Sequence, residues 1–467
     1  MTVSEQLVEN ILQTQFDSLG KEVVDSAKNR IIDAVGCLIA GANAAGCLMV
    51  VDLVREWGGA GESTILVHGG RGPAHNVAMV NSIMTRSYDF EPCAPYVEGK
   101  SLPGHISGST VPTAIAVAEQ KGASGKELIT AVVLGDDVAS RILAASDYSF
   151  DLGWDCTGTV NMFGTTAIAG RLWGLDERQL LNAFGIVVNQ LAGTFQSIYD
   201  GTHCFKLPQG LAARAGIVSA ELASKGFTGV KDFLQSKNGY FAQYCRAYQP
   251  ETVTKDLGKK FYADATFKPY PCCRTLHAAI DCSLELVRNK DLSLEDIDKV
   301  TVYVAPAMRE WRMFLGQPFE VGDIPQVNAA FSLAYNVANA LVRKSVRLEH
   351  FTEEFIRDPQ VLNLAKRVKL TATLPLDRPQ AASVSVKMKS GSEFATIKFP
   401  RVASAYVDIA RGDPISNPLT AEEIREKFRT NTAFSKRVSK ENTEKALKML
   451  DKLEEINDVD AIISELS

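Results

Sequence analysis

The sequence predicts a mainly α protein with a large all-helical domain and a smaller α+β lid domain. Apolar residues recur every three or four positions through most of residues 1–267, as they do in amphipathic helices. Beyond residue 267, alternating β-branched segments are interspersed with helical ones, which is typical of an α+β domain. We therefore expect the helical domain to comprise residues 1–267 and 403–467, and the lid domain residues 268–402.

The clearest helix is predicted over residues 22–40, where Gly41 is expected to end it at the C′ position. Similar periodicity predicts further helices, separated by glycine-containing breaks, at residues 111–120, 125–145, 163–175, 177–191 and 211–225. The first 260 residues therefore read as almost wholly helical.

The predicted lid combines strands with helices. Strands are expected at residues 299–305 and 368–374, and a hairpin is expected from residues 383–388 and 393–399. Helices are expected at residues 276–288 and 329–341. Thr420 and Glu423 form a capping box, which predicts that the charged tail is helical and returns to the helical domain.

Composition excludes several classes of function. The 50 basic and 55 acidic residues give a formal charge of −5, so nothing attracts nucleic acid or an anionic membrane in general. Polar residues interrupt every apolar stretch, and the amino terminus lacks the features of a secretory signal. We expect a cytoplasmic protein that has no membrane or nucleic-acid partner.

The cysteines and the known motifs argue against bound cofactors. Nine cysteines are spread along the chain without the spacing of a disulfide framework or a CxxC site, and the adjacent Cys272 and Cys273 suit packing better than chelation. HExxH, Walker A and dinucleotide-binding GxGxxG motifs are absent from the sequence. Chemistry performed by side chains alone, with no metal and no organic cofactor, is therefore expected.

Only six histidines occur, and His105 has the most suggestive context. It lies in a loop rich in glycine and serine before a helix of small residues, a common position for a general acid or base, although it could simply cap that helix. Asp89 and Glu91 follow a helical stretch. Their spacing suggests that they point in different directions, with one serving as a base or orienting a histidine.

Cationic side chains gather in two further segments. Lys206 precedes a helix rich in alanine and glycine, where it and the free N–H groups of the helix could hold a carboxylate. Lys268, Arg274 and His277 lie together at the predicted domain boundary, where clefts tend to form. An arginine can bind a carboxylate through two hydrogen bonds, and a lysine can stabilise a developing enolate.

The order and spacing of these motifs resemble the MmgE/PrpD family along nearly the whole chain. The matches are residues 30–36, 88–90, 105–107, 153–154, 157–159 with Gly164, 268–271 with 273–274 and His277, 331–335 and 417–420. The family includes 2-methylcitrate dehydratase, cis-aconitate decarboxylase and iminodisuccinate epimerase. The resemblance implies a helical domain, an α+β lid, a homodimer and no cofactor.

The resemblance also implies roles for particular residues. It assigns active-site roles to Asp89, His105, Lys206 and Lys268, with Arg274 and His277 following in the same motif. We expect Asp89, His105, Lys206, Lys268 and His277 to be catalytic, and Arg274, Tyr88, Asp155 and Ser107 to bind the substrate, although Asp155 could instead take over as a base. The chain departs from the family pattern at two places. Glu91-Pro92-Cys93 replaces the usual two acids and nearby histidine, and Asp155 stands where many members carry a histidine.

We expect a lyase that acts next to a carboxylate of a small di- or tricarboxylic acid. Dehydration resembling that of 2-methylcitrate is favoured, with His105 as acid/base and Asp89 orienting it or acting as base. Lys206, Lys268 and Arg274 would contact carboxylates. His277 is either a second acid/base or an inward helix residue bound to a carbonyl. Decarboxylation, epimerisation and a catalytically silent metabolite-binding protein remain the alternatives.

Overall fold

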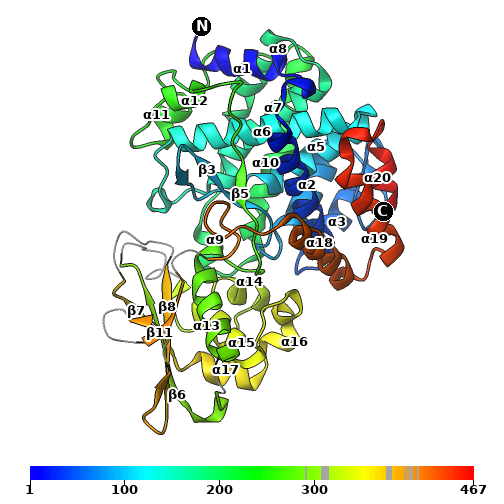
Figure 1. Ribbon diagram of the computed structural model, residues 1–467. Helices are drawn as coiled ribbons and strands as arrows, with labels where there is room; N and C mark the ends of the chain where they lie inside the picture. Colours follow the sequence, from blue (N-terminus) through cyan, green and yellow to red (C-terminus); the bar gives the residue numbers. More distant parts are fainter. Residues whose placement is uncertain (290–291, 307–314, 375–380, 395–396, 399–402, 408–409) are drawn as a thin grey trace.

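A computed structural model describes residues 1–289, 292–306, 315–374, 381–394, 397–398, 403–407 and 410–467. It shows a large helical part and a smaller α+β part (Figure 1), which confirms the predicted fold class. In the described ranges, no helix is both long and apolar enough to cross a membrane.

The helical part is built around α5 and α6, which pack against α7, α2 and α4. Residues 107–119 of α5 are all buried, which small side chains permit because they let neighbouring helices approach closely. The helices of this part are α1 (Val3–Gln13), α2 (Lys21–Gly41), α3 (Cys47–Trp57), α4 (Ala74–Arg86), α5 (Ser107–Lys121), α6 (Gly125–Ala145), α7 (Val160–Trp173), α8 (Glu177–Val187), α9 (Gln196–Tyr199), α10 (Leu207–Ser224), α11 (Tyr240–Tyr244) and α12 (Glu251–Thr254).

The predicted helix at residues 22–40 is confirmed as α2, but the role expected of Gly41 is wrong. Gly41 is the last helical residue and Ala42 is the C-cap. A Cβ at Gly41 would lie 1.9 Å from the carbonyl oxygen of Met84, so glycine is needed for the close approach of α4 rather than for a left-handed turn. This contact fixes the end of α4, which reaches the candidate active site.

Short strands interrupt the helical part, contrary to the expectation that it is almost wholly helical. A three-stranded antiparallel sheet has the order β4-β3-β5, and a second pair joins β1 to β2. Pro95 within β3 and the shortness of β5 hide this sheet from pattern analysis. The strands are β1 (Ser63–Thr64), β2 (Arg71–Gly72), β3 (Cys93–Val97), β4 (Lys100–Ser101) and β5 (Asp264–Thr266).

The lid has a sheet of order β10-β11-β8-β6-β7, with β9 also paired to β8. All pairs are antiparallel except β6 with β7, and α13 packs against β8 and β11. The strands are β6 (Ile297–Val304), β7 (Val368–Ala372), β8 (Ala382–Met388), β9 (Glu393–Phe394), β10 (Ile397–Lys398) and β11 (Ala403–Val407). The predicted hairpin is confirmed only at β8 and β9. Residues 397–398, expected in the same strand, form β10 and pair with β11 instead, and residues 395–396 and 399 lie outside the described ranges.

The helices of the lid are α13 (His277–Asn289), α14 (Pro325–Ala330), α15 (Leu333–Arg343), α16 (Glu353–Ile356) and α17 (Pro359–Ala365). The helix expected over residues 329–341 is divided between α14 and α15. The Ser332 hydroxyl accepts a hydrogen bond from the backbone N–H of Tyr335 and begins α15 there.

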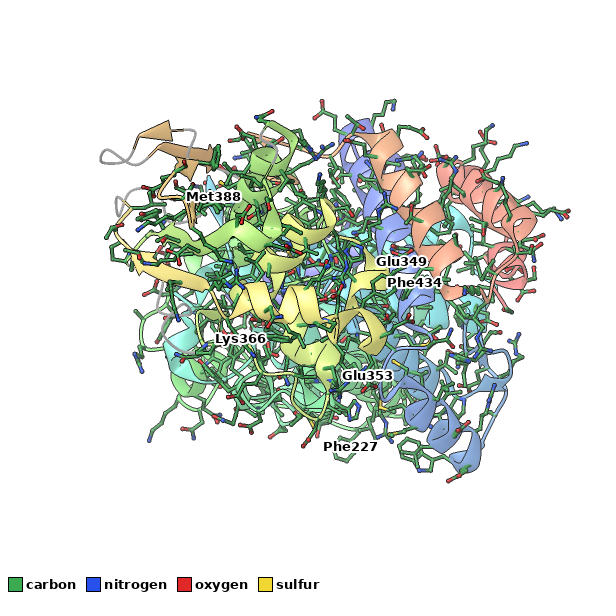
Figure 2. All side chains as sticks on the ribbon, turned by 90° about the horizontal axis from the view of Figure 1, so that it is seen from below. Phe227, Glu349, Glu353, Lys366, Met388 and Phe434 are labelled. Atoms are coloured by element: carbon green, nitrogen blue, oxygen red, sulfur yellow. The ribbon has the colours of Figure 1, made fainter. Side chains whose placement is uncertain are left out.

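The end of the chain leaves the lid later than expected. Because β11 pairs with β8, the sheet extends beyond the predicted boundary at residue 402. The tail helices are α18 (Ala421–Ser435), α19 (Lys440–Asp451) and α20 (Asp460–Glu465), and α18 packs along α2, so the tail returns to the helical part (Figure 1). The Thr420–Glu423 capping box is confirmed. Figure 2 labels Glu349 of the lid and Phe434 of α18. The short lid segment that contains Glu349 contacts α18 where the lid meets the helical part.

Candidate active site

A cavity of about 220 Å³ lies between the helical part and the lid. The helical part contributes polar groups such as Arg86, His105 and Asp155, whereas the lid contributes Arg274 and Phe331. A larger groove of about 530 Å³ runs along α10, but Arg214 is the only charged residue among the described residues that line it. We place the chemistry in the smaller cavity because it holds the acid/base groups.

The acidic residues of the site are brought together by an unusual turn after α4. Arg86 ends α4, and Asp89 adopts a positive φ of 49°, which is uncommon for a residue other than glycine. As a result both carboxylates reach Arg86: Asp89 forms a close ion pair with it, and Oε1 of Glu91 lies 3.0 Å from Nη1. The expectation that Asp89 and Glu91 point in different directions is wrong, because it assumed ordinary backbone between them.

His105 is held against this pair of acids. Its Nδ1 lies 2.8 Å from Oε1 of Glu91, and its Nε2 lies 3.9 Å from Oδ1 of Asp89. The loop is fixed from behind, since Oδ2 of Asp264 accepts hydrogen bonds from the backbone N–H groups of Ile106 and Ser107, both at 2.7 Å. The imidazole lines the cavity and its side chain is 21% exposed, so it can meet a ligand.

Lys268 reaches the same cluster from the start of the lid. Its Nζ donates to the backbone carbonyl of Asp89 at 2.6 Å and to the carboxylate at 2.7 Å. Burial alone would lower the pKa of Lys268, but the charges around it, of which that of Asp89 is the largest, together outweigh burial and raise the pKa. The ammonium is fully buried behind Asp89, so its effect on a ligand passes through that carboxylate.

These contacts set the charges within the cluster. Burial opposes ionisation of Asp89 and Glu91, but the nearby cations hold the pKa of each carboxyl below its usual value. Burial, with the charges of Arg86 and Lys268, lowers the pKa of His105 below 6.5, although Glu91 opposes the shift. The resulting cluster has two anions, two cations and a neutral imidazole at pH 7.

The protonation of this imidazole follows from its partners. An ionised carboxylate can only accept a hydrogen bond, so we assign the ring hydrogen to Nδ1, which donates it to Glu91. Nη1 of Arg86 also lies 3.2 Å from Nδ1, but it is already engaged by both carboxylates. The lone pair of Nε2 is therefore available as a base.

Two further predicted residues line the cavity. Arg274 lies at the end of the segment that carries Lys268, and its Nη2 donates to the carbonyl of Ala410 at 3.2 Å. Asp155 begins a short 3₁₀ turn, and its Oδ1 accepts a hydrogen bond of 2.9 Å from the N–H of Thr157. One cationic and one anionic side chain thus face the same small cavity.

Lys206 and His277 are buried outside the lining of the cavity. Nζ of Lys206 bonds the carbonyl of Ala45 and donates to Oγ of Ser87 at 3.1 Å, next to Arg86 in the chain. Nε2 of His277 lies 3.3 Å from the carbonyl oxygen of Cys272, and burial holds the pKa of His277 well below its usual value. For His277 this is the inward, carbonyl-bound arrangement that was the alternative to an acid/base role.

Tyr88 and Ser107, predicted to bind substrate, also lie outside the described cavity lining. The ring of Tyr88 packs edge-on against Phe434 of α18, with centroids 5.6 Å apart. The hydroxyl of Ser107 lies 3.3 Å from Oδ2 of Asp136, so it faces the helical core.

Arg86 was missed by sequence reasoning, and Glu91 was seen only as a possible base or orienting acid. An arginine at the end of a predicted helix, followed three and five residues later by acids, was the available signal. A second signal was that buried carboxylates need a partner. The positive φ at Asp89, which brings the three groups together, had no sequence signal.

Asp89, Glu91 and His105 could also be considered as metal ligands. One donor atom from each lies within 4.8 Å of the others. However, Arg86 and Lys268 already neutralise the two carboxylates, and a divalent ion would have to displace these buried cations. The donor set therefore fits the protein's own cations better than a metal.

The fold and the site define a two-part helical protein with a buried acid/base cluster that can act on a small anion. Comparison of the sequence gives the family: the MmgE/PrpD N-terminal domain matches residues 5–253 and the C-terminal domain matches residues 270–455. The chain belongs to the MmgE/PrpD family, as the resemblance indicated.

Its relatives include several cis-aconitate decarboxylases. The enzyme of Aspergillus terreus is 24% identical over 441 residues, which cover 89% of this chain and 86% of the relative. That of Homo sapiens is 26% identical over 410 residues, which cover 84% and 79%. That of Mus musculus is 23% identical over 478 residues, which cover 98% and 92%.

Proposed function

We propose that this protein is a cofactor-independent lyase that acts at the carbon next to a carboxylate in a small di- or tricarboxylic acid. The observation that carries the proposal is the His105–Glu91 pair, in which a neutral imidazole presents a free Nε2 to the cavity. Membership of the MmgE/PrpD family, with decarboxylases among the relatives, supports a lyase.

In the proposed reaction, Nε2 of His105 removes a proton from the carbon next to the substrate carboxylate. Arg274 binds that carboxylate and stabilises the charge that develops on its oxygens. Asp89, 3.9 Å from Nε2, stabilises the imidazolium that forms. Loss of a hydroxyl group from the adjacent carbon, with a proton returned by the imidazolium, then gives an alkene and water.

Dehydration is the first candidate because its first step is the removal of a proton by a base. A histidine whose pKa is lowered and whose Nδ1–H is engaged by a carboxylate suits proton removal better than proton donation. Decarboxylation is the second candidate because the relatives carry that activity in their names. It would leave a carbanion at the same carbon, which a protonated His105 would quench.

We also propose that the residues behind the cavity act through their neighbours. Lys206 would hold the turn after α4 through Ser87, and Lys268 would hold Asp89 in its positive-φ conformation. His277 would support the segment that carries Arg274 through the carbonyl of Cys272. In this account they are positioning residues and do not touch the substrate.

The test is incubation of the protein in D₂O with citrate, 2-methylcitrate, cis-aconitate, and hydroxy- and aminosuccinates, each followed by proton NMR. New vinyl signals from a saturated acid would support dehydration, and loss of a carboxylate would support decarboxylation. Deuterium entry with inversion would favour an epimerase instead. Absence of turnover and of exchange in every acid would contradict the proposed function.

A further inference from the structure

Four charged groups around the cavity are joined by direct ion pairs, and two others lie outside that set. Asp89 and Glu91 are matched by Arg86 and Lys268 through direct ion pairs. Among the described residues that line the cavity, the other two charged side chains are Arg274 and Asp155. Within the described ranges, neither of these two side chains has an oppositely charged partner within ion-pair distance, although Arg86 attracts Asp155, and Asp281 and Asp413 attract Arg274, over longer distances.

Arg274 is held in place without being neutralised. Its Nη2 donates to the carbonyl of Ala410, a partner that carries no net charge, and Arg274 lines the cavity. An arginine stays protonated in a protein even where burial lowers its pKa, as it does here. It therefore provides a site for one carboxylate.

Asp155 is an anion fixed on the cavity wall. Its N–H donates to the carbonyl of Gly193 at 3.3 Å, and the adjacent Trp154 forms a β-bridge with Thr194. Its Oδ1 accepts the hydrogen bond from Thr157, which leaves the other oxygen as the remaining acceptor. Only 4% of the residue is exposed, so a ligand in the cavity would replace most of its remaining water.

We propose that Asp155 selects acids that carry a hydrogen-bond donor, either a hydroxyl or a protonated amine, in addition to the carboxylate bound by Arg274. A donor group would satisfy the free oxygen of Asp155. A further carboxylate at that point would place two anions together in a partly desolvated cavity, which is unfavourable. This inference rests on the proposed function for the position of the substrate and narrows its substrate class.

Binding of four probes tests this inference by isothermal titration calorimetry. Succinate carries no donor, malate adds a hydroxyl, aspartate adds an ammonium, and tricarballylate adds a third carboxylate. We expect malate or aspartate to bind at least about 10-fold more tightly than succinate, and tricarballylate to bind more weakly than either. Equal affinities for succinate and both donor-bearing acids, or binding of none of the four, would overturn the inference.

Asp155→Asn is the matching variant because its amide oxygen can still accept the hydrogen bond from Thr157. It should lose the preference for aspartate over succinate and should bind tricarballylate more tightly than the wild type does. Asp147→Asn, at an exposed position of the same region, should leave all four affinities unchanged. Unchanged preferences in Asp155→Asn, with a wild-type melting temperature, would also overturn the inference.

Binding and turnover separate the two proposals. A donor preference that depends on Asp155, without turnover of any acid, would support the inference and contradict the lyase. Turnover with no donor preference would support the lyase and contradict the inference.

Discussion

Nζ of Lys268 lies 2.6 Å from the backbone carbonyl oxygen of Asp89 and 2.7 Å from its carboxylate. The first residues of the lid are thereby joined to the turn that follows α4. In the proposed role of Lys268, this buried ion pair stabilises the unusual backbone of Asp89 and so orders the acids around His105.

Lys268→Met should therefore weaken both stability and activity. Removal of one partner leaves the Asp89 charge less compensated in the interior, so we expect the free energy of unfolding to fall by about 3–5 kcal/mol. Urea denaturation measures this free energy and the midpoint of unfolding. Lys452→Met removes an exposed lysine paired with Glu455 and should leave the midpoint nearly unchanged. Equal midpoints for the two variants would contradict the structural role of Lys268.

Glu91→Gln should lower activity and move its pH dependence. His105 acts as a base only when neutral, so kcat/KM should fall as the pH falls through a pKa below 6.5. The Glu91 charge raises that pKa, so its removal should move the acid limb to lower pH. Turnover at the plateau should fall by about 10²- to 10⁴-fold because the imidazole loses its orienting partner.

A pH profile of kcat/KM for the wild type, Glu91→Gln and the exposed control Glu295→Gln checks this prediction. An acid limb that stays in place in Glu91→Gln, or moves to higher pH, would show that Glu91 does not set the ionisation of His105.

Asp264 should stabilise the His105 loop as a hydrogen-bond acceptor rather than through a negative charge. Burial, aided by the charge of Asp136, raises the pKa of Asp264 well above its usual value, so a neutral amide is a close substitute. Asp264→Ala leaves the N–H groups of Ile106 and Ser107 without their partner, at a cost of about 1–3 kcal/mol for each. Asp264→Asn should retain most of the stability and activity. Equal losses in both variants, measured by thermal unfolding, would contradict this account.

Gly41→Ala tests the close approach of α2 and α4. The new methyl group would lie 1.9 Å from the carbonyl oxygen of Met84, so the helices must separate, at a cost of about 1–3 kcal/mol. Activity should also fall because Arg86 ends α4. Gly20→Ala is the control, since a Cβ there meets nothing within 4 Å. A Gly41→Ala variant as stable as Gly20→Ala would show that the backbones move apart without cost.

The sequence was most informative where periodicity is strong. Residues 22–40 were predicted as a helix, and α2 occupies residues 21–41, because one apolar face is repeated over many turns. The sheet of β3, β4 and β5 escaped prediction because its strands are short and depend on partners far away in the chain. The homodimer and the cytoplasmic location stay predictions.

In the candidate site, too, the sequence indicated which residues take part, but not the contacts between residues that are brought together only by the fold. His105 was selected because histidines are few, Asp89 and Arg274 because of the charged segments that contain them, and Asp155 through the family resemblance. All four line one cavity. His277 shares a motif with Arg274, and Lys206 was selected in a segment of its own, but both side chains bond to groups outside the cavity lining, a distinction that spacing cannot make. The Arg86–Glu91 contact depends on a single backbone conformation at Asp89.

The most direct test of the account is exchange of the substrate hydrogen next to the carboxylate, measured by proton NMR in D₂O on an acid that the wild type converts. We predict that the wild type exchanges this hydrogen or removes it. A His105→Gln variant that has the melting temperature of the wild type should do so at least about 100-fold more slowly. Exchange at the wild-type rate in His105→Gln would contradict the assignment of Nε2 of His105 as the base.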